Sequence, residues 1–445
     1  MKSSAHSFAW LFLLLLPAAA AWRPFSTAPA AAWVLPGAGG LALAVCLVRG
    51  SLSWRQGLAG GAIAALIALY AWNPTHRWSE GVGLLPAEHV SGWPGSAFPA
   101  GSREALGWAI AMGAGYAVAF RLSARQVRGM QWAALAAGVA MALAVLVQRL
   151  EPQPFPVYER TGLFVNENHF AVFSNMLLPV VLALAARFRF QAVQEGRPSS
   201  PDVLVLLAAV LMGAAVVLSR SRAGVAVMAL LVVAHVRECG RVARLHPFVR
   251  LPISRLARRL GGVAIAVAAG LAVAAFAREW RHFSDVRGEW IFRSGILKDA
   301  LSAWWAQPVW GTGPGTFSVV FPYYQSEFYQ GRTLLHAHCD PVQFLFEFGW
   351  AGGLWVLLAL GLGFSARNSG RPAGDAIPSL ADLEGRAFAL GLLACLVHSL
   401  IDFPLRVPLI AVLAAIWAGA WAGLRAVPAV AARARSQGLG GEARA

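Results

Sequence analysis

The sequence predicts an all-α, polytopic membrane protein with about twelve transmembrane helices and one large loop on the outer side of the membrane. Three observations support this prediction. Of the 445 residues, 58% are hydrophobic. Only 13% are charged, whereas an ordinary soluble domain has about 25%. The apolar residues also occur in long runs, separated by short Arg-rich or Pro- and Gly-rich segments. A soluble fold could not cover so much apolar surface with so few charges.

Twelve segments approach the roughly 17–25 mostly apolar residues that a bilayer-spanning helix needs. The first also has features of a secretory signal peptide, because Lys2 precedes an apolar core that ends before Ala18. We favour a retained helix, since the later loops then alternate correctly; its removal would leave eleven spans and an outer N-terminus. The predicted spans are residues 8–22, 31–48, 57–72, 107–120, 131–148, 169–186, 203–219, 223–236, 260–277, 342–364, 386–400 and 408–424.

Charge distribution predicts the orientation. With the N-terminus in the cytoplasm, most of the 37 basic residues fall on inner segments, and the whole net charge of +16 lies there. An excess of Lys and Arg on cytoplasmic loops is the usual pattern in membrane proteins. The basicity therefore reflects orientation rather than nucleic-acid binding, and we expect both termini in the cytoplasm. Four scattered cysteines predict neither a disulfide framework nor a metal site.

We expect one polytopic domain over residues 1–445, with long outer segments at 73–106, 149–168 and 278–341. The last is the longest. Within it, Trp290, Leu297, Leu301 and Trp304 recur at helical spacing and predict an amphipathic helix that ends before Pro308. Such a helix would lie on or dip into the outer leaflet.

Unusual polar residues gather on the predicted outer side. Arg220 and Arg222 occupy a tight turn between two spans, where cations are costly unless anions match them. Their side chains could simply extend to the membrane interface, but basic residues that do so are more common on the cytoplasmic side. We therefore favour an anion-binding role, with a phosphate or pyrophosphate on a lipid carrier as the ligand.

Two histidines precede the span at 342–364. His336 or His338 could act as a general base near neutral pH, or could be an interfacial histidine bonded to backbone. A zinc site has little support, because only Cys339 lies nearby. The run Gly311-x-Gly313-x-Gly315 lacks the Lys-Ser/Thr ending of a phosphate loop. It predicts a tight turn, with backbone amides that could face the site.

These residues together resemble the O-antigen ligase/polymerase superfamily, over residues 162–408. The order and spacing of five motifs carry the resemblance. They are G-x-F-x-N-x-N-H-F-A at 162–171, S-R-S-R-A-G at 219–224, P-x-x-G-x-G-x-G-x-F at 308–317, H-A-H-C-D-P-V-Q-F-L-F-E-F-G at 336–349 and H-S-L-I-D-F-P-L-R-V-P at 398–408.

The resemblance implies a GT-C-like membrane glycosyltransferase of the bacterial inner membrane. Such enzymes move glycans from undecaprenyl-pyrophosphate carriers to an acceptor glycan or lipid at the periplasmic face. We expect no cofactor, and a metal is not obligatory if guanidinium groups neutralise the charge that develops on the leaving group. By this resemblance His338 activates the acceptor hydroxyl, and Arg222 and Arg293 hold the pyrophosphate. Cys339 stands where Asn is common in the family. The other residues expected to bind substrate are Arg220, Asn166, Asn168, His336, Asp340 and Gln343.

Three hypotheses stay open: a glycan transferase, a transporter and a non-catalytic subunit. The acceptor of a transferase could be lipid A-core, another repeat unit, or a protein Ser or Thr. From another class, a transporter or flippase of polysaccharide intermediates would predict polar or Pro/Gly-broken positions near the midplane of several spans. A non-catalytic assembly subunit would tolerate loss of His338.

Overall fold

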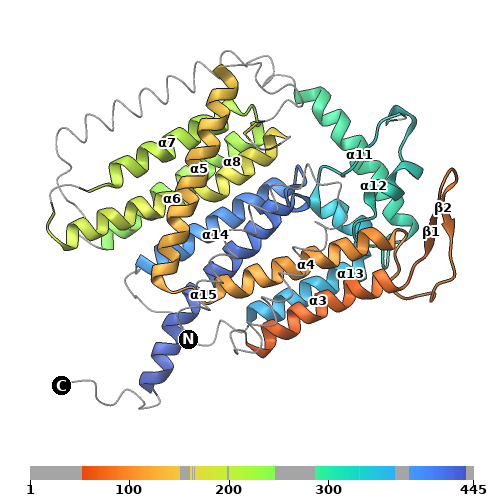
Figure 1. Cartoon of the computed structure of the whole chain (residues 1–445), viewed down its shortest axis with the longest axis horizontal. Coiled ribbons are helices and arrows are strands. Elements are labelled where there is room, and N and C mark those ends of the chain that lie inside the picture. Colours follow the sequence, from red (N-terminus) through yellow and green to blue (C-terminus); the bar gives the residue numbers. More distant parts are fainter. Residues whose placement is uncertain are drawn as a thin grey trace.

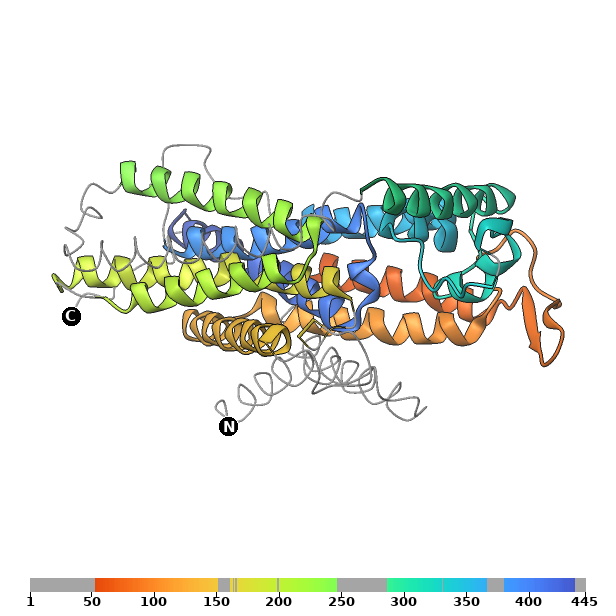
Figure 2. The same cartoon turned by 90° about the horizontal axis from the view of Figure 1, so that it is seen from above.

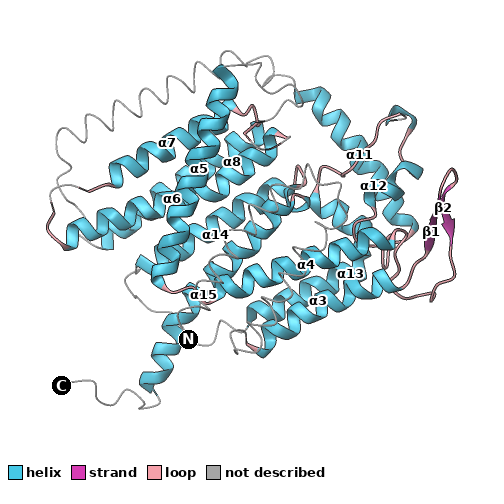
Figure 3. Ribbon diagram, viewed as in Figure 1, coloured by secondary structure: helices cyan, strands magenta, loops and turns pink. Residues whose placement is uncertain are grey.

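A computed structural model of the chain describes residues 53–150, 161–162, 164, 166–197, 200–245, 286–329, 331–365 and 380–436. This part of the chain is mostly helical, with a single two-stranded antiparallel hairpin (Figure 3). Three of the predicted spans, at 8–22, 31–48 and 260–277, lie outside the described residues.

The elements follow one another in this order: α3 (Trp54–Trp72), β1 (His76–Ser79), β2 (Gly83–Pro86), α4 (Pro99–Phe120), α5 (Ala124–Leu150), α6 (Glu167–Gln194), α7 (Asp202–Leu218), α8 (Arg222–Leu245), α11 (Val286–Ala306), α12 (Phe317–Val320), η3 (Phe321–Tyr323), η4 (Glu327–Tyr329), α13 (Asp340–Ser365), α14 (Leu380–Ser399), η5 (Pro404–Arg406) and α15 (Pro408–Ser436).

The long helices form one elongated bundle (Figures 1 and 2). α3 packs on α4 and α13, while α6 packs on α5, α7 and α14; α15 joins the two groups through α4 and α14. Four described helices are long and apolar enough to cross a membrane, namely α5, α6, α13 and α15, and α7 is a shorter apolar helix. A polytopic membrane protein is thus consistent with the helices that the structure describes.

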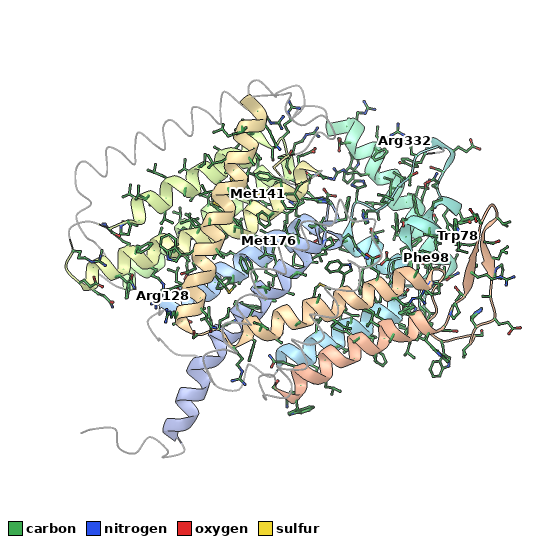
Figure 4. All side chains as sticks on the ribbon, in the orientation of Figure 1. Trp78, Phe98, Arg128, Met141, Met176 and Arg332 are labelled. Atoms are coloured by element: carbon green, nitrogen blue, oxygen red, sulfur yellow. The ribbon has the colours of Figure 1, made fainter. Side chains whose placement is uncertain are left out.

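The main core lies around α6. In its apolar stretch 89% of the residues are buried, because α5, α7, α8 and α14 all pack against it. Met141 from α5 and Met176 from α6 both lie in this core (Figure 4). A smaller core belongs to the segment between α11 and α13, where Ile296, Phe317 and Phe346 pack together. The segment that the sequence predicts to lie outside (residues 278–341, called the outer segment below) is therefore, in its described part, a folded unit attached to α13.

Exposed tryptophans mark the two ends of α3. The side chains of Trp54 and Trp72 are 70% and 67% exposed. Eighteen residues separate them, which is about 27 Å along a helix. Tryptophans favour both membrane interfaces, which lie about 30 Å apart. This spacing is typical of a helix that crosses the hydrocarbon layer.

The predicted span at 342–364 is a broken helix, which the hydropathy pattern did not reveal. Within α13, Gly349 has φ 65° and ψ −177°, and the break leaves carbonyl groups without helical partners. The glycine-rich segment supplies those partners. The amide of Thr312 donates to the carbonyl of Phe346 (3.1 Å), and that of Gly313 donates to the carbonyl of Glu347 (2.8 Å). The segment before α12 therefore stabilises the break in α13.

These bonds correct one expectation about the glycine run. The amides of Thr312 and Gly313 are used by α13, and the amide of Gly311 donates to the carbonyl of Gln307 (2.9 Å). They are not directed at a ligand. The expected tight turn is confirmed, because all three glycines have positive φ.

The predicted amphipathic helix before Pro308 is confirmed as α11, which ends at Ala306. Its predicted apolar stripe is not its core face. Ile296, Ala300 and Ala303 are buried, whereas Trp290 and Leu301 are 66% and 40% exposed. The helix therefore has two apolar faces, and the sequence pattern identified the exposed one.

Replacing Gly349 by Ala should strongly destabilise the fold. A Cβ there would lie 2.2 Å from the carbonyl oxygen of Val309, at a positive φ, and the strained backbone alone costs about 1–3 kcal/mol. We expect a clearly lower thermal midpoint for the purified protein in detergent. Gly361→Ala is the matched control, because its Cβ would meet open space in the same helix; Ala is the better helix former. Equal midpoints for the two variants would contradict this account of the break.

Candidate functional site

His338 lies at the end of the outer segment in a strained conformation. Its φ of 53° is in the left-handed region, which non-glycine residues rarely occupy. The amide of the preceding Ala337 donates to Oε1 of Gln343 (3.1 Å) and fixes the loop. Nδ1 of His338 lies 3.4 Å from Oδ1 of Asp402, and the histidine side chain is 23% exposed. A carboxylate at one ring nitrogen leaves the other available for proton transfer.

Asp402 is the partner that organises this contact. Its side chain is fully buried. Oδ2 accepts a hydrogen bond from Nδ2 of Asn168 (2.7 Å), and Oδ1 accepts one from the amide of Phe403 (3.0 Å). Burial alone would raise the pKa of Asp402. The close contact with the His338 ring and the positive charge of Arg293 outweigh burial and hold that pKa well below its usual range. The carboxylate is therefore charged at neutral pH.

Asn168 connects Asp402 to the Ser-Arg-Ser-Arg turn before α8. Its Oδ1 accepts a hydrogen bond from the hydroxyl of Ser221 (2.6 Å). The same hydroxyl oxygen accepts a bond from the amide of Gly224 (3.0 Å) and caps the first turn of α8. Arg220 and Arg222 flank this serine in the chain, and Arg220 has a φ of 72°. The turn that carries both arginines is thus tied to the His338–Asp402 pair.

Arg293 reaches the same loop from α11. Its Nη1 donates to the carbonyl of Ile401 (2.5 Å), one residue before Asp402. Nη2 lies 3.3 Å from a carboxylate oxygen of Glu289, one helical turn earlier, and the side chain is 25% exposed. The arginine predicted from the large loop and the histidine predicted from its end therefore converge on two consecutive residues.

A buried ion-pair network holds this loop on α13. Nη1 of Arg406 donates to Oε2 of Glu347 (2.6 Å), and its Nε lies 3.6 Å from Oδ1 of Asp340. Burial opposes the charge of Arg406, but the Glu347 and Asp340 carboxylates raise its pKa above the ordinary value. Asp340 also accepts a bond from the amide of Leu405 (3.0 Å). The network fixes the loop of Asp402 relative to the loop of His338.

His336 is placed differently from His338. Its ring stacks on Phe403 with 4.2 Å between centroids, and His169 and His338 approach the same ring edge-on. Burial lowers the pKa of His336 to about 3, and the charge of Arg406 acts in the same direction. This histidine therefore stays neutral and packs, while His338 faces a carboxylate.

The predicted site residues thus fall into groups. His338, Arg293 and Asn168 meet at residues 401 and 402, while Arg220 and Arg222 flank the serine that bonds to Asn168. Asn166 caps α6, its side chain accepting from the amide of Asn168 (2.7 Å). The buried residues with scaffold contacts are Asp340 and Gln343.

The sequence analysis did not select Asp402, Glu347 or Arg406 as site residues. A signal was present, because Asp402 and Arg406 both lie in the H-S-L-I-D-F-P-L-R-V-P motif. What spacing could not reveal was that Asp402 pairs with His338. His398, from the same motif, is fully buried, and neither of its ring nitrogens has a hydrogen-bond partner in the described part of the chain.

Cys339 lies between His338 and Asp340 in the chain, but its side chain takes no part in the hydrogen bonds and ion pairs described above. Its thiol is free and buried, and burial raises its pKa. Its carbonyl accepts from the amide of Gln343 (3.0 Å) at the start of α13. Within the described ranges, no group of three His, Cys, Asp or Glu side chains is arranged to hold a metal ion.

Comparison with known families identifies part of the chain. Residues 207–357 match the family described as O-antigen ligase. The resemblance predicted from the motifs is confirmed over this segment, which contains Arg222, Arg293 and His338. It ends before Asp402 and begins after Asn168. No curated protein matches the chain.

Acidification should test the placement of His336. The folded chain keeps His336 neutral down to about pH 3, whereas an unfolded chain binds a proton near pH 6.5. Because the unfolded state binds more protons between these values, the contribution of His336 to stability falls as the pH falls through this window. His336→Phe keeps an aromatic ring on Phe403. Between pH 7.5 and 5, we expect the thermal midpoint of this variant to fall less than that of the wild type. His89→Phe, at an exposed position, is the control; equal losses for all three proteins would contradict the placement.

Proposed function

We propose that this protein transfers a glycan from an undecaprenyl-pyrophosphate carrier to an acceptor hydroxyl, at the outer face of a bacterial inner membrane. The observation that supports it most is the His338–Asp402 pair, with Arg293 bonded to the residue before Asp402. A base, its orienting carboxylate and a cation that meet at the loop after α14 suit a transfer in which a proton leaves and a phosphate charge develops.

His338 is the proposed general base. It takes the proton of the acceptor hydroxyl as the acceptor oxygen forms a bond to the anomeric carbon of the donor. The bond between that carbon and the pyrophosphate oxygen breaks, and its electron pair leaves with undecaprenyl pyrophosphate. The Asp402 carboxylate stabilises the imidazolium and holds the ring in position. By family resemblance alone, we expect inversion at the anomeric carbon.

Arg222 and Arg293 are proposed to bind the pyrophosphate, with Arg220 beside them. Guanidinium groups match phosphate oxygens in pairs and stay charged at any physiological pH. They stabilise the charge that develops on the leaving group. The link from Ser221 through Asn168 to Asp402 supports this assignment, because it ties the arginine turn to the base.

The acceptor defines the specific reaction, and we propose ligation to a lipid or polymerisation of repeat units. Both use the same base and the same leaving group, and so does transfer to a protein hydroxyl. A polysaccharide transporter would need no base and no orienting carboxylate. The buried, charged Asp402 beside His338 therefore favours group transfer over transport.

Loss of the base or the loop arginine should abolish most of the activity. We expect His338→Ala to lower the rate of glycan transfer by about 10²–10⁴-fold, the usual contribution of a general base. Arg293→Ala should lower it by about 10²–10³-fold, as for other charge-stabilising groups. The measurement is transfer by purified protein from lipid-linked glycan, with surface polysaccharide and accumulated carrier followed in the host.

Matched controls make this test specific. His89→Ala and Arg287→Ala remove an exposed histidine and an exposed arginine of α11, and should leave transfer intact. Asp402→Asn should lower the maximal rate and change the Michaelis constant little, because Asp402 orients the base and does not contact the acceptor. A His338→Ala protein that inserts normally and transfers glycan at the wild-type rate would refute the proposed reaction. A variant that loses surface polysaccharide in the host, while its purified protein still transfers glycan, would point to transport.

Chelation tests the role given to the arginines. If guanidinium groups alone neutralise the leaving group, purified enzyme should keep its transfer rate in excess EDTA. Added Mg²⁺ should then restore nothing to Arg293→Ala. Strict dependence of the wild-type rate on a divalent ion would assign the leaving-group charge to a metal and would reject this part of the mechanism.

A further inference from the structure

The exposed side of α11 carries an apolar stripe that the reaction does not use. Its members line one shallow groove along the helix. Trp290 and Trp305 are 66% and 73% exposed, and Leu301 is 40% exposed. These exposures leave the stripe uncovered by the described part of the chain. The lining residues are Trp290, Ser294, Leu297, Lys298, Leu301, Ser302, Trp304 and Trp305.

The opposite side of α11 is firmly anchored. Ile296, Ala300 and Ala303 are buried in the core of the outer segment. The hydroxyl of Tyr329 donates to the carbonyl of Phe292 (2.7 Å). Because this core holds the buried face, the tryptophan-rich stripe points away from the described part of the chain. Contiguous exposed apolar patches of this kind mark a binding surface.

The placement of α11 indicates what surrounds it. Figure 1 shows that α11 crosses the direction of α3, α4 and α13, at the end of the bundle where α12 and the β-hairpin lie, and Figure 2 shows it at the edge of the molecule. α13, on which α11 packs, is long and apolar enough to cross a bilayer. A helix across the end of such a bundle lies at the depth of the lipid headgroups.

The chemistry of the stripe fits phospholipid. Tryptophan favours the membrane interface, where its ring is apolar and its N–H is hydrated. The groove contains one cation, Lys298, and no acidic side chain. An apolar face with a basic residue is the pattern of a helix that lies in the plane of an anionic lipid surface. Because the groove is shallow and lies along a single helix, it cannot enclose one ligand molecule. This favours contact with a lipid layer over binding of a soluble ligand.

We propose that α11 binds the outer leaflet of the membrane through this stripe, and that this contact holds Arg293 on the loop of Asp402. Arg293 is three residues after Trp290 and four before Leu297, so all three share one side of the helix. Tilting the stripe away from the lipid would withdraw the guanidinium from the carbonyl of Ile401. Lipid contact would thereby position a charge at the site, a role that rests on the proposed function.

Photocrosslinking in native membranes tests the lipid contact without reference to activity. The photoreactive residue p-benzoylphenylalanine would replace Leu301. Leu357 of α13 is the positive control and Val82 of the hairpin loop is the negative control, each being 67% exposed. We expect position 301 to crosslink phospholipid as position 357 does, and position 82 to yield none. A position 301 that behaves like position 82, or that captures a protein instead, would overturn the proposal.

A charge placed in the stripe tests the link to Arg293. Leu301→Glu should lower glycan transfer roughly tenfold or more, because a misplaced charge-stabilising group costs at least that, with an unchanged thermal midpoint. Ala306→Glu adds the same charge to α11 at an exposed position away from the stripe, and should transfer normally. Lipid crosslinking with wild-type transfer by Leu301→Glu would remove the link to Arg293. Lipid crosslinking with full activity of His338→Ala would refute the reaction while leaving the lipid contact in place.

Discussion

The buried carboxylate of Asp402 is the group on which the candidate site depends. A charged carboxylate without partners would be costly in so apolar a protein. Its two oxygens accept hydrogen bonds from Asn168 and the amide of Phe403, and one of them lies 3.4 Å from the His338 ring. Its backbone carbonyl accepts from the amide of Asp340 (3.1 Å). These partners come from three of the motifs, at 162–171, 336–349 and 398–408. One buried charge therefore requires α6, the loop before α13 and the loop after α14 to meet.

The second constraint is the break in α13. A helix interrupted at membrane depth is tolerated only where protein groups satisfy its free carbonyls. The Thr312 and Gly313 amides do so, and the Glu347–Arg406 pair closes the same region on its other side. The first half of α13 is thus held by polar bonds rather than by helix continuity.

The candidate site and the apolar stripe both depend on how α11 is placed. α11 uses one face to build the core of the outer segment and one residue, Arg293, to reach the site. Its remaining face is rich in tryptophan. In the proposed reaction, a cation for the leaving group is thereby carried by the same helix that is proposed to contact lipid.

Composition and periodicity predicted an all-α membrane protein, because few charges and long apolar runs suit a membrane environment, and the four long apolar helices that the structure describes are consistent with this. They also determined α11, since residues at helical spacing ahead of a proline define a helix and its end. The motifs identified His338, Arg293 and Asn168 as candidates, and the family match over residues 207–357 includes the first two of these.

Tertiary structure alone decided which residues are partners. Asp402 lies more than sixty positions from His338 in the chain, and no spacing rule links them; the contact arises because two loops meet at one end of the bundle. The break at Gly349 was equally hidden, since an apolar run has the same composition whether or not its helix is continuous. The stripe on α11 was visible in the sequence, but which face became core depended on the neighbours that α11 packs against. Local patterns record what each segment can form, whereas pairing between distant segments is set only when the whole chain has packed.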